Sequence, residues 1–160
     1  MQSHSIIVCD ADMDRLSRLV RALRYSFSRD QQQLELLDQT LESAEVTSSD
    51  RIPVNVVRMN SRMRILDFET QKKDVYTLVF PENADVSRGL ISVLAPVGIA
   101  LLGRSQGDVI EAKVPGGTRN LRVEQVSYRP GIAGKGVRPD RSKRRELHLG
   151  RRVQRTSLAA

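Results

Sequence analysis

The stretch from Ile91 to Gly117 constrains the fold more than any other part of the chain. Alternating apolar residues lead to Ala95-Pro96, and a proline can open a helix because its fixed φ and missing N–H cost nothing in the first turn. Gly103 stands where a helix needs a left-handed residue at its end. The sequence therefore predicts a short buried helix between these points. Its apolar positions are Val97, Ala100 and Leu101, flanked by Ile99 and Leu102.

A β-hairpin is predicted to follow this helix. A turn is expected at residues 106–108 and a strand at 109–114. The run Pro115-Gly116-Gly117 is typical of a tight turn, and a second strand is expected at 121–126. The local order of elements is thus strand, helix and hairpin.

Further strands are expected earlier in the chain, at residues 54–59, 61–68 and 75–80, with a kink at Asn60-Ser61. Together with the stretch from Ile91 they predict four or five antiparallel strands around one helix. In this arrangement, contacts between neighbours along the chain are expected to dominate. The fold class is therefore α+β.

Two helices are predicted before these strands. The first is expected from Asp12 to Tyr25. Acidic residues 10, 12 and 14 suit the N-terminus of a helix better than an EF-hand, whose required Gly at the sixth position and Glu at the twelfth are replaced here by Arg15 and Arg21. Ser28 and Gln31 resemble a capping box for the second helix. Apolar residues at heptad spacing continue that helix and predict an antiparallel hairpin; they are Leu34, Leu37, Leu41 and Ala44.

The net charge of +7 resides in the C-terminal segment, because residues 135–160 carry nine basic residues against two acidic ones. We expect residues 132–160 to be a flexible basic tail. The hairpin is assigned to residues 1–50 and the sheet domain to 51–131. The tail residues expected to contact nucleic acid or an acidic surface are Arg141, Lys143, Arg144, Arg145, Arg151 and Arg152.

Composition excludes several classes of site. The single cysteine, Cys9, rules out an intramolecular disulfide and a multi-cysteine metal site, and it is expected in the core. No signal segment and no apolar run near 18 residues is present, so a cytoplasmic protein without a membrane span is expected. No metal, cofactor or catalytic residue is expected, and the protein is predicted to be a monomer.

The motifs from Ser92 to Gly98, Ala100 to Gly103, Gly107-Asp108 and Val114 to Gly117 closely resemble the C-terminal domain of the bacterial Gre transcript-cleavage factors, the GreA/GreB family. The resemblance implies an FKBP-like fold, an antiparallel sheet wrapped on one helix, that docks on RNA polymerase. The residues expected to dock are Ser92, Val93, Ala95, Pro96, Val97 and Gly98.

The hairpin turn indicates which branch of the family the chain resembles. Gre factors act through a long hairpin whose tip carboxylates help to hold a metal ion, and a hard cation needs at least two such groups close together. This tip, Ser28-Arg29-Asp30, offers one. Segments 6–10, 41–44, 52–57 and 59–62 are similar to the Rnk-like branch, regulators of nucleoside diphosphate kinase with a shortened hairpin.

The resemblance therefore implies a non-enzymatic regulator that docks near the secondary channel of RNA polymerase, does not stimulate transcript cleavage and competes with Gre factors. Three alternatives remain open. The first is a Gre-type factor with residual anti-arrest activity, and the second is an FKBP-like prolyl isomerase, which needs an apolar cup lined by aromatic residues. The third is a non-specific nucleic-acid-binding protein that acts through the basic tail.

Overall fold

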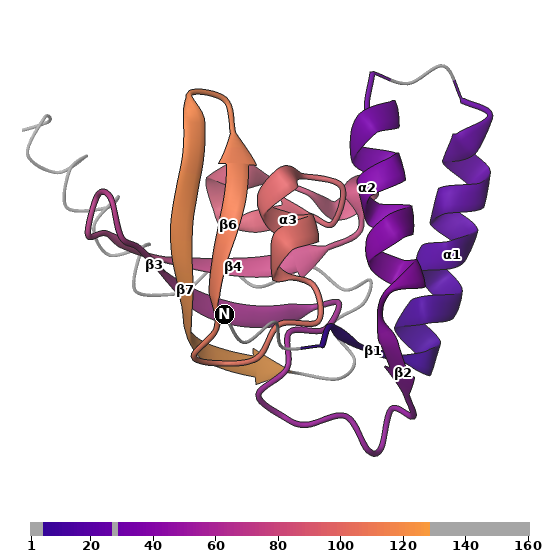
Figure 1. The fold of residues 1–160 in the computed structure, drawn as a ribbon, viewed down its shortest axis with the longest axis horizontal. Coiled ribbons are helices and arrows are strands. Elements are labelled where there is room, and N and C mark those ends of the chain that lie inside the picture. Colours follow the sequence, from indigo (N-terminus) through magenta and orange to yellow (C-terminus); the bar gives the residue numbers. More distant parts are fainter. Residues whose placement is uncertain (1–4, 27–28, 129–160) are drawn as a thin grey trace, which may run out of the picture. The chain divides into compact units, whose positions relative to one another are not determined.

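A helical hairpin and a pair of short strands form the N-terminal part of the computed structural model, which describes residues 5–26 and 29–128 (Figure 1). Strand β1 (Ile7–Cys9) leads directly into α1 (Asp10–Arg24), and α2 (Gln31–Glu42) leads into β2 (Glu45–Thr47). β1 and β2 pair in parallel, with Val8 opposite Val46. The sequence did not predict β2, because three residues within a polar connection carry too little pattern to identify a strand.

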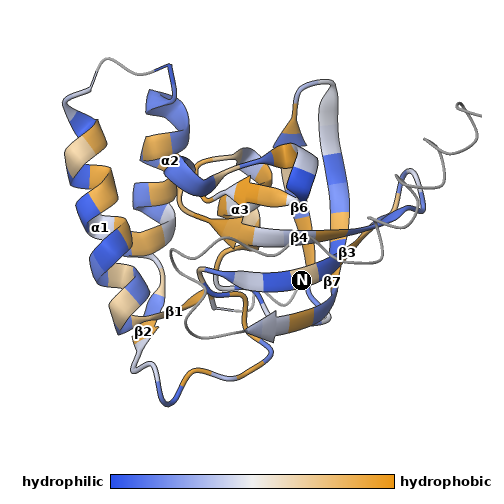
Figure 2. Cartoon of the chain, turned by 180° about the vertical axis from the view of Figure 1, so that it is seen from behind, coloured by the Kyte–Doolittle hydropathy of each residue, from blue (hydrophilic) through white to orange (hydrophobic). Residues whose placement is uncertain are grey.

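The two helices pack through one apolar seam. Leu16 and Val20 of α1 are buried, as are three leucines of α2, Leu34, Leu37 and Leu41. This confirms the three leucines of the seam predicted for α2, but the helix ends at Glu42, so Ala44, predicted to continue it, lies beyond the helix. Apolar and polar residues alternate around both helices in Figure 2, as this packing requires.

The helix starts differ from their predictions. α1 begins at Asp10, two residues early, with Cys9 as N-cap. The capping box predicted for α2 is wrong, because Asp30 is the N-cap residue. The Gln31 side chain instead donates a hydrogen bond to the Ser26 carbonyl (2.6 Å), across the turn rather than to an N-cap N–H. Ser28 lies outside the described residues.

A five-stranded sheet follows, built from β3 (Ser61–Asp67), β4 (Lys73–Val79), β5 (Leu90–Ser92), β6 (Val109–Val114) and β7 (Gly117–Tyr128). The strand order is β5-β4-β3-β7-β6. The prediction of an antiparallel sheet is wrong at one edge, where β4 and β5 pair in parallel. This is because the chain between them turns through two short 3₁₀ helices, Pro81–Asn83 and Val86–Arg88, and does not form a hairpin.

One pairing at the centre of this sheet, that of β3 with β7, joins strands far apart in the chain, whereas the other three pairings join consecutive strands, in line with the expectation of mainly local contacts. β7 lies between β3 and β6, and Ser61 pairs with Tyr128 while Asp67 pairs with Leu121. The strand predicted at residues 54–59 is wrong. That segment forms turns and a single bridge between Val56 and Ser105, and its apolar residues Val56, Val57 and Met59 are nevertheless buried.

Helix α3 (Pro96–Leu101) begins at the predicted proline and packs in the core formed by the curled sheet and the hairpin. Gly103 has a positive φ of 74°, as predicted for the residue after the helix end. The buried side of α3 differs from the predicted stripe. Ile99, Leu101 and the following Leu102 are buried, whereas Val97 and Ala100 are half-buried.

Hydrogen bonds join the hairpin to the sheet part. The Ile7 N–H donates to the Gly103 carbonyl (3.2 Å), and the Gly103 N–H donates to the Val57 carbonyl (3.0 Å). The Met59 N–H donates to the Asp12 carboxylate (3.1 Å). The bonds of Ile7 and of Asp12 cross residues 50 and 51, where the domain boundary was predicted, and that boundary stays a prediction. The basic tail, residues 132–160, lies outside the described residues.

Candidate functional site

The predicted docking segment, residues 92–98, comprises the last residue of β5, a bend and the first three residues of α3. The Ser92 hydroxyl accepts a hydrogen bond from the Leu94 N–H (3.0 Å), and the Ser92 carbonyl accepts one from the Ala95 N–H (3.0 Å). The Val93 N–H donates to the Val79 carbonyl of β4 (2.9 Å). The bend is therefore held by two hydrogen bonds to Ser92 within it and by one backbone bond to β4.

The six predicted docking residues fall into two groups. Val93 is 0% exposed and Gly98 is also buried, so neither offers a surface to a partner. A Cβ atom at Gly98 would lie 2.1 Å from the Ser92 carbonyl oxygen, which explains why this position holds glycine. The remaining four residues are half-buried and present part of their surface: Ser92, Ala95, Pro96 and Val97.

The tip of the hairpin is exposed and polar. Arg29 and Asp30 are both exposed, and Tyr25 at the end of α1 is 88% exposed. Asp30 is the N-cap residue of α2, but its side chain makes no capping hydrogen bond. The Asp30 carboxylate therefore lies at a helix start without capping it by a hydrogen bond.

Acidic residues at the start of α1 have structural partners. The Asp10 carboxylate accepts hydrogen bonds from the Ser49 hydroxyl and the Ala11 N–H, both at 2.8 Å, and these bonds lower its pKa. The Asp12 carboxylate accepts the Met59 N–H. Within residues 5–26 and 29–128, no group of three His, Cys, Asp or Glu side chains is arranged to hold a metal ion.

Aromatic side chains are dispersed, and most are paired with arginine. The Arg15 guanidinium lies 4.3 Å from the centre of the Phe80 ring, and the Arg58 guanidinium lies 4.1 Å from that of Tyr128. Phe80 itself is buried in the main core. The aromatic cup needed for a prolyl isomerase therefore finds no support in these positions.

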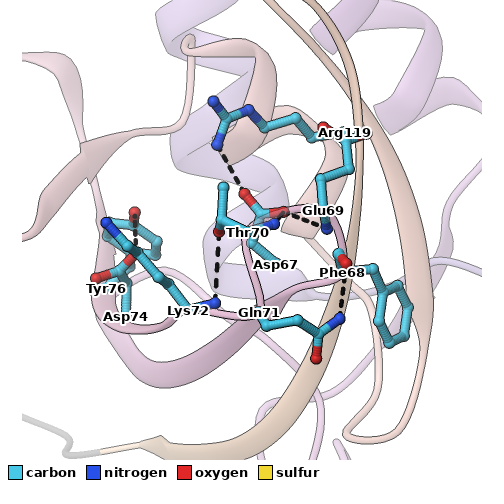
Figure 3. A network of polar contacts seen from close by, with 9 residues as sticks. All are labelled: Asp67, Phe68, Glu69, Thr70, Gln71, Lys72, Asp74, Tyr76 and Arg119. Carbon is cyan, nitrogen blue, oxygen red and sulfur yellow. Dashed lines mark hydrogen bonds and ion pairs between the residues drawn. The ribbon is translucent and has the colours of Figure 1, made fainter.

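A polar network holds the turn between β3 and β4 (Figure 3). The buried Asp67 carboxylate accepts hydrogen bonds from the Glu69 N–H (2.9 Å), the Thr70 N–H (3.3 Å) and Arg119 Nη1 of β7 (2.7 Å). Desolvation raises the pKa of Asp67, but these three donors and the Arg119 charge together lower it below its ordinary value. Nearby, desolvation and the Asp74 carboxylate raise the pKa of Tyr76. Asp67 thus ties the turn to β7.

Sequence reasoning missed a set of arginines on the sheet. Arg62 and Arg64 of β3 alternate with buried residues and are exposed, and Arg122 of β7 is exposed between buried Leu121 and Val123. The alternation of arginine with apolar residues in the sequence Ser61-Arg-Met-Arg-Ile65 was a signal for one charged face. The contribution of Arg122 was not visible, because it depends on the pairing of β3 with β7. Elsewhere, no helix in the described part of the chain is long and apolar enough to cross a membrane.

Comparisons with known proteins agree in pointing to one family. The family described as "Transcription elongation factor, GreA/GreB, C-term" matches residues 52–128. The chain is 35% identical over 135 residues to the regulator of nucleoside diphosphate kinase of Escherichia coli K12, covering 84% of this chain and 97% of that protein. It is 33% identical over 107 residues to transcription elongation factor GreA of Bartonella henselae, covering 67% and 68% of the two chains.

A solved structure is similar over the same range. The prokaryotic transcription elongation factor GreA/GreB from Nitrosomonas europaea aligns with a TM-score of 0.64 and 37% identity, covering 79% of this chain and all of that chain. The helical N-terminal part and the curled five-stranded sheet are therefore shared with a GreA/GreB protein. By their names, these relatives are elongation factors or a regulator.

Proposed function

This chain belongs to the GreA/GreB family of transcription elongation factors, and we propose that it is a regulator that binds RNA polymerase without stimulating transcript cleavage. The observation that carries this proposal is the hairpin tip. Arg29-Asp30 supplies one carboxylate beside a cation, and residues 25–28 add none. A single carboxylate leaves most of the coordination sphere of a hard cation to water.

The length of the hairpin supports the same conclusion. At 1.5 Å per residue, the 15 residues of α1 span about 22 Å and the 12 residues of α2 about 18 Å. A hairpin of this reach enters a channel mouth but does not extend far along it. We therefore propose that the protein occupies the entrance of the polymerase secondary channel and competes there with Gre factors.

Docking is assigned to the bend before α3 and to the first residues of that helix. In this proposal residues 51–131 form an FKBP-like domain, and its contact with polymerase includes the half-buried residues Ser92, Ala95, Pro96 and Val97. Val93 and Gly98 shape the bend from inside. The tip residues Arg29 and Asp30 then face the channel, while residues 1–50 act as the inserted hairpin. The tail arginines and Lys143 stay a predicted contact with nucleic acid or an acidic surface.

A pull-down with core RNA polymerase tests this function. The wild-type protein is expected to bind and to displace GreA, and a backtracked transcript is expected to remain uncleaved. Ala95→Arg places a charged chain on the docking bend and is expected to weaken binding at least tenfold. Val54→Arg is the matched control, because Val54 is 87% exposed on a separate loop.

Three results would count against the proposal. Absence of binding to polymerase would refute it outright. Equal binding of Ala95→Arg and Val54→Arg would move the docking surface elsewhere. Cleavage of the backtracked transcript would instead support a Gre-type factor with anti-arrest activity.

A second candidate function comes from the relative in Escherichia coli. That protein is named for regulating nucleoside diphosphate kinase, and this chain matches 97% of its length. We therefore also propose that this chain influences the activity or amount of that kinase. Kinase activity measured in cells with and without the protein, and then with the two purified proteins mixed, separates control of expression from direct contact.

A further inference from the structure

The outer side of the sheet carries three arginines that the family comparison does not explain, and we name Arg62, Arg64 and Arg122 the arginine face. Arg62 and Arg64 lie two residues apart on β3, so their side chains leave the sheet on the same side. Arg122 of β7 pairs with Leu66, two further residues along that side of β3. The three charges therefore share one surface.

Every cross-strand neighbour of the arginine face is uncharged. Arg62 pairs with Thr77 and Ser127, Arg64 pairs with Val75 and Gln125, and Arg122 pairs with Leu66 and Val109. Sheet surfaces commonly place opposite charges across from one another, because such pairs stabilise the sheet and like charges destabilise it. Here three like charges gather with no carboxylate directly opposite. This arrangement leaves the guanidinium groups available to an external anion.

The nearest acidic side chain on β7 is already paired. Glu124 sits at the irregularity in the pairing of β7 with β3, and its carboxylate accepts an ion pair from Lys73 Nζ (3.1 Å). Its charge is therefore offset locally. Glu111 of β6 lies on the same side of the sheet, two residues from Val109, so the three arginines outnumber the one carboxylate left without a paired lysine there.

The arginine face borders an open hollow of about 630 Å³. Arg64 and Arg122 line it together with Gln106, Gln125 and Glu124, whose carboxylate is paired with Lys73. Planar guanidinium groups bind phosphate oxygens through paired hydrogen bonds, and amides add donors without charge. The hollow is thus suited to phosphate groups rather than to an apolar ligand.

An exposed ring stands next to the same arginines. Phe68 follows β3 directly, and the Arg122 guanidinium lies 5.7 Å from the centre of its ring. A base can stack on such a ring or on a guanidinium plane, and this stacking is largely independent of base identity. Arginines beside an exposed ring favour a nucleic acid strand over an acidic protein as ligand. A nucleic acid supplies both phosphates for the arginines and bases that stack on the ring, whereas a carboxylate-rich surface supplies only the negative charge.

We propose that the arginine face binds single-stranded nucleic acid, through its phosphates at Arg62, Arg64 and Arg122 and through base stacking at Phe68. The contact is separate from polymerase docking and from the basic tail. The chain continues from Tyr128, which pairs with Ser61 beside Arg62, into the basic residues 132–160. In the sequence, the strand that carries Arg122 is therefore followed by a segment with further positive charge.

Fluorescence anisotropy with a labelled 15-nucleotide uridine RNA and the full chain tests this proposal without polymerase. The variant Arg62→Gln/Arg64→Gln/Arg122→Gln is compared with Arg18→Gln/Arg21→Gln/Arg51→Gln, a matched control that removes three exposed arginines elsewhere. Losing three phosphate contacts is expected to lower the salt dependence of log Kd by about 2, at ~0.7 per contact. The affinity lost in the variant relative to the wild type is therefore expected to be roughly a hundredfold greater at about 0.1 M salt than at about 1 M. The control is expected to change little.

A second readout locates the contact directly. The arginine Nε–Hε signals of Arg62, Arg64 and Arg122 are expected to shift in an NMR titration with the same RNA, and circular dichroism verifies that each variant is folded. Equal losses in the two triple variants, or shifts confined to the tail arginines, would overturn the proposal. Equally tight binding of uridine triphosphate would indicate a nucleotide site, and equally tight binding of polyglutamate an acidic protein partner; either result also overturns it.

Discussion

Replacing Gly98 with alanine is expected to destabilise the protein, although alanine is the better helix former. Gly98 lies inside α3 and its φ is not positive, so the backbone conformation itself does not require glycine. On helix propensity alone the substitution would stabilise the protein by about 1 kcal/mol. The space around the new methyl group decides instead whether the substitution raises or lowers the free energy of unfolding.

The magnitude follows from three backbone contacts. The added Cβ would lie 2.1 Å from the Ser92 oxygen, 3.0 Å from the Ser92 carbonyl carbon and 3.2 Å from the Val93 Cα, whereas ordinary contact begins near 3.4 Å. No side chain can rotate away, because all three atoms belong to the main chain. Moving the Ser92 carbonyl would also strain its hydrogen bond with the Ala95 N–H.

Overpacking of this kind costs about 3 kcal/mol or more when the backbone must shift. After subtraction of the propensity gain, we expect Gly98→Ala to lower the free energy of unfolding by about 2 kcal/mol. For a folded part of this size, the melting temperature should fall by roughly 8 °C. The measurement is urea unfolding followed by circular dichroism, supported by a thermal melt.

Ala100→Gly is the matched control on the same helix. It removes a methyl group from a half-buried position and should destabilise the protein by about 1 kcal/mol through propensity. Steric control of α3 therefore predicts that both variants are less stable than the wild type. If Gly98→Ala were as stable as the wild type or more so, the proposed role of the close approach to Ser92 would be wrong.

Three further predictions concern the hairpin and the polar network. Leu37→Ala empties a fully buried site in the helical seam and should cost about 2–5 kcal/mol, while Leu36→Ala at a 48% exposed site should change stability by less than about 0.5 kcal/mol; urea unfolding compares them. Asp67 has a lowered pKa in the folded state, so its contribution to stability is complete above the unfolded pKa of about 3.9 and is lost as the pH falls through the lower folded value. The stability difference between the wild type and Asp67→Asn should therefore be constant from pH 7 to 5 and shrink below pH 4. Arg24 and Asp38 form an ion pair across the hairpin (2.5 Å) with the arginine side chain 59% exposed, and a double-mutant cycle should give a coupling of at most about 1 kcal/mol that falls with salt.

Each of these expectations can fail clearly. Equal losses for the two leucine variants would contradict the burial of the seam. If the stability difference between the wild type and Asp67→Asn grew as the pH fell, the inferred direction of the Asp67 pKa shift would be wrong. A coupling between Arg24 and Asp38 well above 1 kcal/mol would mean that the pair is shielded from solvent.

The sequence by itself determined the elements whose signals are local. Pro96 marks the start of α3 and Gly103 its left-handed end, because both residues restrict or permit a backbone conformation regardless of what surrounds them. The leucine spacing in α2 identified the buried seam within a few turns of one helix.

Only the tertiary structure decided how these elements meet. The parallel pairings of β1 with β2 and of β4 with β5, and the position of β7 beside β3, join residues far apart in sequence. No local pattern encodes such partners, because strands of similar alternation can pair in several orders. The ion pair of Asp67 with Arg119 depends on these pairings.

The same limit applies to the functional surfaces. The sequence placed Gly98 in a docking segment, but only the closeness of Ser92 shows that this glycine is internal and structural. The spacing of Arg62 and Arg64 predicts one charged side of a strand. Their position beside Arg122 depends on the register of β3 with β7. Neighbouring residues determine local conformation, because φ and ψ preferences act within a few residues. A surface shared by two strands depends on their pairing, which is set only when the chain folds.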